Sequence, residues 1–243
     1  MNYVIDLALE RVINKRDKSS QPLRYLEIGV YKGQTLQSVS STIKGVEVIK
    51  EGVDPYSPFN EVHRMTSQVF FAINETFWKK KYDVIFIDAL HFSPILNHEI
   101  NESLKILNEH GVLILDDTVP PSKEGGSVEV NSMVELHKKL SYPLFKDYDP
   151  INKDLYEYFK DFPGFPNAVG DCWKSVARIR MTRPDLRVGS LMIPEIDYRG
   201  CTLIVRGSQT LLDPISSDHM DWDYFLENRY NILQFTSLQD ILR

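Results

Sequence analysis

The sequence predicts an α/β protein built on a mostly parallel sheet with helices on both faces. Two short apolar runs, residues 84–87 and 112–115, each end in aspartate. Between them Ile95, Ile100 and Leu104 recur at the spacing of one helix face. A right-handed strand–helix–strand connection makes the two strands parallel and brings both acidic ends to one edge of the sheet. Ligands bind at that carboxyl edge in open α/β sheets, so we expect the functional site there.

Composition limits the class of protein. The 243 residues are 42% hydrophobic and 26% charged, which is ordinary globular usage, and we expect one domain spanning residues 1–243. The net charge of -6 argues against nucleic acid or an anionic membrane as partner. Cys172 and Cys201 form no Cys-x-x-Cys pair, so neither a disulfide framework nor a structural zinc site is expected, and a cytoplasmic location fits. The sequence contains no apolar run long enough to predict a membrane span. The charges from Glu10 onward also interrupt the apolar core that a signal peptide needs.

The N-terminal part predicts a helix, a strand and a glycine turn. Residues 3–14 form an amphipathic pattern within an N-terminal region 1–22, and an apolar strand follows at residues 23–28. That strand enters the turn Glu27-Ile28-Gly29-Val30-Tyr31-Lys32-Gly33-Gln34-Thr35, after which we expect a helix ending near Lys44-Gly45. A glycine turn between a strand and a helix is typical of a nucleotide-like ligand, although it also occurs as a simple tight turn.

The glycine spacing narrows the ligand. A dinucleotide-binding turn needs a second glycine two places after the first, where the backbone approaches a pyrophosphate. Tyr31 occupies that place, so the turn suits a ligand without a pyrophosphate. The next strand, residues 46–54, ends in Asp54, an acid placed to accept hydrogen bonds from ribose hydroxyls. An Asp-Pro turn is the alternative role for Asp54, and a ribose alone does not separate a methyl donor from NAD.

Residues 66–78 predict a short loop followed by a helix. Thr66, Ser67 and Gln68 offer polar groups where the edge of an adenine ring is expected.

These motifs, in this order, resemble class I S-adenosylmethionine-dependent methyltransferases. The residues that carry the resemblance are Glu27-x-Gly29-x-Tyr31-x-Gly33, Asp54, Ser67-Gln68, Asp88 and Asp116-Asp117. More narrowly, the loop and Ser-Gln are similar to catechol O-methyltransferase, and Asp88-Ala89-Leu90-His91 is similar to the macrocin-type sugar O-methyltransferases. The resemblance implies a Rossmann-like methyltransferase fold with a seven-stranded sheet and transfer of a methyl group to a hydroxyl of a sugar or secondary metabolite. The donor-binding residues that it implies are Glu27, Gly29, Tyr31, Gly33, Thr35, Asp54, Ser67, Gln68 and Asp88.

The acidic edge predicts a metal ion. Two unit charges about 4 Å apart repel by roughly 4 kcal/mol at an effective dielectric of about 20. Clustered carboxylates avoid this repulsion when one of them is protonated, when one points away, or when a cation lies among them. Carboxylates suit Mg²⁺, Mn²⁺ or Ca²⁺. The resemblance assigns Asp88, Asp116 and Asp117 as ligands, against the alternative of turn or helix-capping roles. It assigns His91 as the general base, a role that an imidazole suits at neutral pH; a structural histidine is the alternative.

The second half predicts an insertion and a closing hairpin. Residues 120–170 are rich in proline, glycine and aromatic residues, and we interpret them either as a lid that lines an acceptor pocket or as a contact in a homo-oligomer. A helix at 170–183 and strands at 186–193 and 202–205 are expected to complete the sheet. The tail, 208–243, predicts an amphipathic helix whose acidic N-terminus accounts for Asp218, Asp221 and Asp223.

Two rival functions stay open from the sequence. One is an NAD-dependent or sugar-nucleotide Rossmann enzyme, which Tyr31 disfavours. The other is a non-catalytic S-adenosylmethionine-binding protein, against which the intact Asp88, His91, Asp116 and Asp117 weigh. The acceptor is not readable from the residues.

Overall fold

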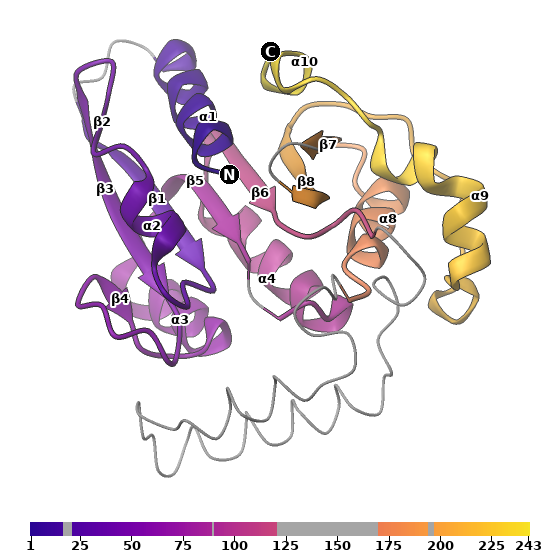
Figure 1. The fold of residues 1–243 in the computed structure, drawn as a ribbon, viewed down its shortest axis with the longest axis horizontal. Coiled ribbons are helices and arrows are strands. Elements are labelled where there is room, and N and C mark those ends of the chain that lie inside the picture. The colour runs from indigo at the N-terminus through magenta and orange to yellow at the C-terminus, as the bar shows by residue number, and fades with distance from the viewer. Residues whose placement is uncertain (17–20, 89, 121–169, 194–196) are drawn as a thin grey trace.

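The computed structural model describes residues 1–16, 21–88, 90–120, 170–193 and 197–243. Within them an eight-stranded sheet runs in the order β2-β3-β1-β5-β6-β8-β7, with β4 paired to β3 (Figure 1). The strands are β1 Leu23–Ile28, β2 Thr42–Ile43, β3 Val46–Val53, β4 Val62–His63, β5 Tyr82–Ile87, β6 Leu107–Leu115, β7 Leu186–Ile193 and β8 Asp197–Arg206. The helices are α1 Asn2–Lys15, α2 Gln34–Ser38, α3 Ser67–Ile73, α4 Ser93–Ile106, α8 Trp173–Thr182, α9 Trp222–Leu233 and α10 Leu238–Leu242, with a π-helical turn at Asn74–Trp78 and a 3-10 turn at Ser217–His219.

The strand directions confirm the predicted fold class. β4, β3, β1, β5 and β6 are parallel, and β8 lies antiparallel between β6 and β7. The hairpin of β7 and β8 therefore closes a mostly parallel sheet, as expected for a Rossmann-like methyltransferase fold. From β1 the chain builds β3 on one side and β5 and β6 on the other, which creates a topological switch point between β1 and β5.

The region before β3 corrects one prediction and adds a strand. The helix that we expected to end near Lys44-Gly45 ends at Ser38, and β2 then pairs antiparallel with β3. Lys44 and Gly45 make the turn of this hairpin with φ values of 48° and 81°. Two consecutive positive φ values suit the tight hairpin turn that joins twisted strands, so the glycine marks a hairpin and not the end of a helix. The short β4 was also not predicted from the residues. Within the described ranges the sheet has eight strands and not the seven that the resemblance implied, because the added β2 pairs with β3.

The two faces of the sheet carry separate hydrophobic cores. Along β5, Val84 and Phe86 pack in the core beneath α1, α2 and α10, whereas Ile85 and Ile87 pack against α3, α4, α8 and α9 (Figure 1). This alternation follows from the two-residue period of a strand. Burying one large apolar side chain contributes about 1.5–3 kcal/mol to the stability of the fold. A strand such as β5, which is apolar on both faces, is therefore held firmly up to its carboxyl end.

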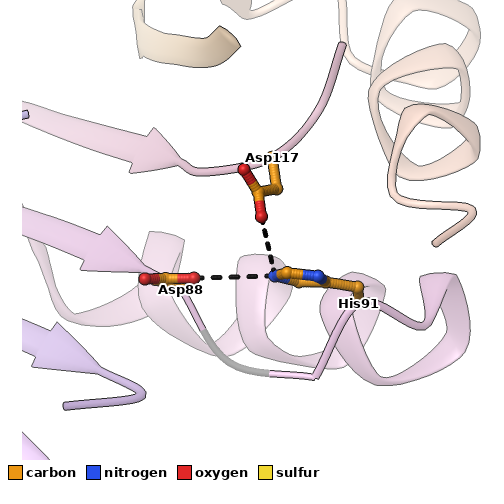
Figure 2. A group of neighbouring side chains, drawn as sticks. All are labelled: Asp88, His91 and Asp117. Carbon is orange, nitrogen blue, oxygen red and sulfur yellow. Dashed lines mark ion pairs between the residues drawn. The ribbon is translucent and has the colours of Figure 1, made fainter. Parts of the chain in front are cut away.

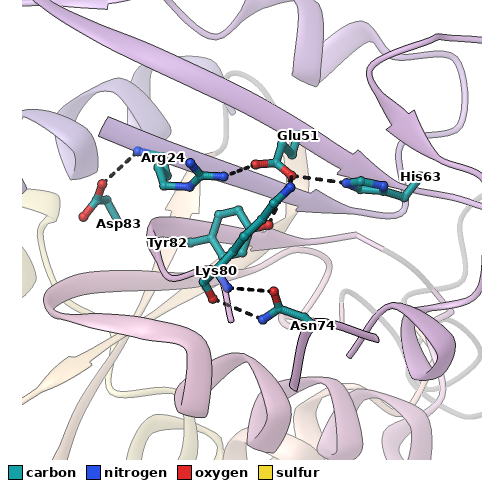
Figure 3. Close-up of polar contacts among 7 residues, drawn as sticks. All are labelled: Arg24, Glu51, His63, Asn74, Lys80, Tyr82 and Asp83. Carbon is teal, nitrogen blue, oxygen red and sulfur yellow. Dashed lines mark hydrogen bonds and ion pairs between the residues drawn. The ribbon is translucent and has the colours of Figure 1, made fainter. Parts of the chain in front are cut away.

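A polar network ties four parallel strands together (Figure 3). The Glu51 carboxylate of β3 is hydrogen-bonded to Arg24 of β1 and to the Lys80 ammonium at 2.5 Å. It is also hydrogen-bonded to His63 of β4 at 3.2 Å and to the Tyr82 hydroxyl of β5 at 3.3 Å. Glu51 is buried, and a buried carboxylate is tolerated only where donors surround it. We interpret the network as structural.

Other expectations have mixed outcomes. The acidic start of the C-terminal helix is confirmed for Asp221, whose carboxylate caps α9 by accepting the Tyr224 N–H at 2.9 Å, and for Asp223 in the first turn, whereas Asp218 lies in the 3-10 turn before the helix. The lid or oligomer contact predicted at 120–170 lies almost wholly in residues 121–169, outside the described residues, and both alternatives stay predictions. None of the helices in the described ranges is long and apolar enough to cross a lipid bilayer.

Candidate functional site

The carboxyl ends of the central parallel strands form one edge. The backbone N–H of Gly29 donates to the end of β3 at 2.9 Å, that of Asp88 to the end of β1 at 2.8 Å, and that of Asp116 to the end of β5 at 2.9 Å. The loops after β1, β5 and β6 therefore start side by side. Because the switch point lies between β1 and β5, this edge is where an open α/β sheet leaves room for a ligand.

Three predicted site residues meet at this edge. Figure 2 shows Asp88 at the end of β5 and Asp117 after β6 both pointing toward the His91 ring. The His91 Nε2 atom lies 3.5 Å from Asp88 Oδ1 and 3.4 Å from Asp117 Oδ2. The Asp88 side chain is 39% exposed, that of His91 25% and that of Asp117 3%, so the group is open to solvent on one side and closed on the other.

The group has the composition of a metal site but differs from the predicted one. One ligand atom from each of Asp88, His91 and Asp117 lies within 4.8 Å of the others. Asp116, predicted as a ligand, is not part of this group; it is half-buried, and its role as a ligand stays a prediction. Asp117 has a left-handed backbone with φ of 52°, a conformation that aspartate tolerates better than most residues. The turn lets the second aspartate after β6 point back toward His91.

Asp54 organises the glycine turn. Its Oδ2 accepts the Tyr31 N–H at 2.8 Å and its Oδ1 accepts the Tyr56 N–H at 2.7 Å. The second bond belongs to the Asp-Pro turn that was the alternative role for this residue. Each carboxylate oxygen has another lone pair, so hydrogen bonding to a ribose stays a prediction. Tyr31 itself has φ of 46° and is exposed, because Asp54 holds its backbone and leaves its ring free of the core.

Gly33 is required at its position. It precedes α2 with φ of 71°, and a Cβ there would lie 2.4 Å from the Phe59 ring. Gly29 also has a positive φ, of 88°. Thr35 lies half-buried in the first turn of α2. The glycine spacing is therefore set by backbone conformation and by the close packing of Phe59.

Glu27 is a buried acid beside the acidic edge. It is 2% exposed, and its Oε2 accepts the Tyr25 hydroxyl at 2.7 Å. The pKa of Glu27 is raised to about 8, chiefly by burial and also by the carboxylates of Asp88 and Asp54, which together outweigh the hydrogen bond from Tyr25. Glu27 therefore carries a proton at neutral pH.

The predicted adenine-contacting residues lie at the start of α3. Thr66 caps the helix by accepting the Val69 N–H at 3.4 Å. The buried Ser67 hydroxyl donates to Glu99 of α4 at 2.7 Å, whereas Gln68 is half-buried. The adenine roles of Ser67 and Gln68 stay predictions.

Glu99 is a buried acid that the sequence interpretation missed. It is 1% exposed, and its pKa is raised to about 7, because burial outweighs the lowering effects of the Ser67 hydrogen bond and the charge of His91. A glutamate within a helix usually faces water, so the residue type of Glu99 gives no sign of burial. Only its inward position relative to Ile95 and Leu96 would have indicated burial.

Comparison with known proteins gives only distant structural likeness. No protein-family model and no curated protein matches the sequence. Three similar solved structures are the O-methyltransferase TomG from Streptomyces achromogenes in complex with SAM, an O-methyltransferase from Bacillus cereus in complex with SAH, and the MycE methyltransferase from the mycinamycin pathway with Mg, SAH and mycinamycin VI. Their identities are 14%, 15% and 11%, and their TM-scores are 0.45, 0.44 and 0.36. The matches cover 84%, 85% and 90% of this chain and 79%, 92% and 53% of those chains.

Proposed function

We propose that the protein is an S-adenosylmethionine-dependent O-methyltransferase that methylates a hydroxyl of a small molecule, a sugar or a secondary metabolite, with the help of a divalent cation. The observation that carries the proposal is the meeting of Asp88, His91 and Asp117 at the carboxyl edge beside the switch point. The glycine turn and Asp54 follow the strands on the other side of that switch point. A donor site and an acceptor site are thus expected to be neighbours.

The acidic character of the edge supports a cationic donor. The sulfonium and ammonium groups of S-adenosylmethionine are favoured beside Asp54 and Asp88. The Gly-x-x-x-Gly turn lacks the glycine that a pyrophosphate requires, which disfavours NAD. The residues proposed to bind the donor are Glu27, Gly29, Tyr31, Gly33, Thr35, Asp54, Ser67, Gln68 and Asp88.

The residues present fit a divalent cation. Ligand atoms that share one ion at about 2.1 Å lie about 3.0–3.5 Å from one another in octahedral or tetrahedral geometry. The 3.4 Å and 3.5 Å separations from His91 Nε2 to the two carboxylates match that spacing. Asp88 and Asp117 would hold the ion, with Asp116 or His91 as third ligand. The ion would supply Lewis acidity that favours the ionised form of a substrate hydroxyl.

His91 can serve this site in one of two ways. As a general base, its Nε2 takes the proton of the acceptor hydroxyl, since a neutral imidazole accepts protons near pH 7. As a ligand, the same atom is occupied and another group must take the proton. In either case the methyl group is already activated on the donor, so the tasks left to the chain are to align the two substrates and to exclude water.

Calorimetry with S-adenosylhomocysteine, NAD, Mg²⁺ and Mn²⁺ in turn tests donor and metal. We expect binding of S-adenosylhomocysteine and of a divalent cation, and none of NAD. Binding of NAD without S-adenosylhomocysteine would instead support the NAD-dependent alternative. Turnover is then measured with a labelled methyl donor on a panel of catechols and hydroxylated sugars, where EDTA should abolish it and added metal restore it.

Substitutions separate the roles of single residues. Asp54→Ala should weaken S-adenosylhomocysteine binding. His91→Ala should lose turnover with metal affinity unchanged if His91 is the base, and should lose both if His91 is a ligand. His98→Ala, which removes an exposed imidazole of α4, is the matched control and should change neither. Normal turnover of His91→Ala would remove His91 from the mechanism.

A further inference from the structure

Helix α4 begins two residues after His91 without a side-chain cap of its own. Its N-cap position is Phe92, which cannot accept a hydrogen bond through its side chain. The cap is supplied from 78 residues further along the chain, where Asp171 Oδ1 accepts the Ser93 N–H at 2.6 Å and Oδ2 accepts the Ser93 hydroxyl at 2.9 Å. Ser175 of α8 adds a hydrogen bond from its hydroxyl to the Ser93 carbonyl at 3.2 Å. The start of α4 is therefore held by the start of α8.

Gly170 contacts the residues before α4 at His91, two residues before Ser93. It has φ of 55°, and a Cβ there would lie 1.7 Å from the carbonyl oxygen of His91. The backbone at residue 170 thus packs directly on the backbone of His91. Asp171, its neighbour, is buried, so the two residues make a close, buried contact with the stretch from His91 to Ser93.

We infer that Asp171, together with Gly170, is the positioning residue of this site: it fixes the loop that carries His91 and thereby sets the distances from His91 to Asp88 and Asp117. The inference rests on the proposed function. Asp171 itself bonds to Ser93 and not to the ligand atoms of the site, so it acts through the backbone. A metal or catalytic constellation works only when its side chains are held to within about 0.5 Å, which a loop achieves only when it is anchored.

A cap that merely stabilised α4 would affect folding and nothing else. A positioning role predicts in addition a functional loss at the site, because Asp88 and Asp117 keep their own supports at the ends of β5 and β6 while His91 moves. Metal affinity should fall if His91 is a ligand, and turnover should fall at unchanged metal affinity if His91 is the base. The donor side, across the switch point, should be unaffected. These separate effects make the inference testable on the full-length protein.

The test compares Asp171→Ala, Asp171→Asn and Ser93→Ala with Asp221→Ala. Asp221 caps α9 by the same kind of bond but, in the described part of the chain, has no bond to α4 or to the loop of His91, so its loss is a matched control for a lost helix cap. Mn²⁺ affinity, S-adenosylhomocysteine affinity, turnover and amide hydrogen exchange of the peptide 88–96 are measured on each. If His91 is a ligand, we expect Asp171→Ala to weaken Mn²⁺ binding about ten-fold, the usual effect of losing a residue that orients a ligand. If His91 is the base, turnover should fall and Mn²⁺ affinity should stay as in the parent. Exchange at 88–96 should rise about ten-fold, since local opening controls exchange.

The gentler variants keep the test informative if Asp171→Ala does not fold. Asp171→Asn retains an acceptor for the Ser93 N–H and should bind Mn²⁺ nearly as the parent does, whereas Ser93→Ala, which removes one of the two bonds, should be intermediate. S-adenosylhomocysteine affinity should stay unchanged in all of them.

Two results would overturn the inference: parental exchange, turnover and Mn²⁺ affinity in both Asp171→Ala and Ser93→Ala, or equal losses in Asp221→Ala. If the parent protein binds neither Mn²⁺ nor S-adenosylhomocysteine, the proposed function fails. The exchange of peptide 88–96 then decides the anchoring of the His91 loop by itself: faster exchange in Asp171→Ala but not in Asp221→Ala supports it, and equal exchange refutes it.

Discussion

Replacing Glu27 with glutamine should alter how the stability of the protein depends on pH. The pKa of this carboxyl is raised from 4.5 to about 8, chiefly by burial and in part by the neighbouring carboxylates of Asp88 and Asp54. At neutral pH the folded protein therefore holds a proton on Glu27 that the unfolded chain has lost. Glutamine imitates the protonated acid in shape, keeps an acceptor for the Tyr25 hydroxyl and cannot ionise.

The sign and size follow from proton linkage. Because the folded pKa lies above the unfolded one, the contribution of Glu27 is complete below pH 4.5 and is lost as pH rises through about 8. Each pKa unit corresponds to about 1.4 kcal/mol, so wild type should lose about 4 kcal/mol relative to Glu27→Gln between about pH 5 and pH 9. The variant should therefore gain relative stability as the solution becomes alkaline.

Urea denaturation of both proteins at several pH values measures this difference directly. Only the difference between the proteins is used, since it cancels the other titrating groups. Glu47→Gln serves as control, because Glu47 is exposed on the neighbouring strand β3 and its loss should leave the pH profile parallel to wild type. A wild-type-minus-variant difference that changes by less than about 1 kcal/mol across this range would refute the assignment of Glu27 as a buried neutral acid.

Two further substitutions test other parts of the structure. Burial would raise the pKa of Glu51, but hydrogen bonds from His63 and Lys80 bring it down to about 2. The ionised Glu51 therefore stabilises the folded protein above pH 4.5, and this contribution is lost as pH falls toward 2. Glu51→Gln should cost about 3 kcal/mol in urea denaturation at pH 7 and nearly nothing at about pH 2; an equal cost at both would exclude an ionic origin. Gly33→Ala should lower stability by about 1–3 kcal/mol, through its positive φ and its clash with Phe59, and should weaken S-adenosylhomocysteine binding in calorimetry; unchanged values would show that Phe59 moves aside freely.

The parts of the fold that the sequence predicted are those governed by local patterns. The apolar run before Asp88 is short and rich in β-branched residues, which favours a buried strand, and the acid that ends it then lies at the edge of the sheet. The same reasoning placed Asp54 after β3. Where one pattern serves two structures, the prediction failed: glycine at position 45 suits the end of a helix as well as a hairpin turn, and pairing of β2 with β3 decides between them.

The features that the sequence could not show are contacts between distant segments. Asp171 caps α4 across 78 residues, and no local pattern links it to Ser93. Glu99 reads as a surface residue until α3 and α4 pack together and bury it against Ser67. Such partners are set by the way helices pack on the sheet, which a single sequence does not specify.

The identity of the third group beside Asp88 and Asp117 decides which metal the site prefers. Consecutive aspartates after β6 are equivalent in the sequence, and the left-handed backbone at Asp117 is what turns this residue toward His91. If His91 completes the set, one nitrogen and two oxygens favour a transition-metal ion such as Mn²⁺ over Mg²⁺. If Asp116 completes it, the set is all oxygen, Mg²⁺ binds comparably, and His91 is left to act as the base. The ratio of Mn²⁺ to Mg²⁺ affinity in wild type, compared with that in Asp116→Asn and His91→Ala, therefore distinguishes the two chemistries before any acceptor is known.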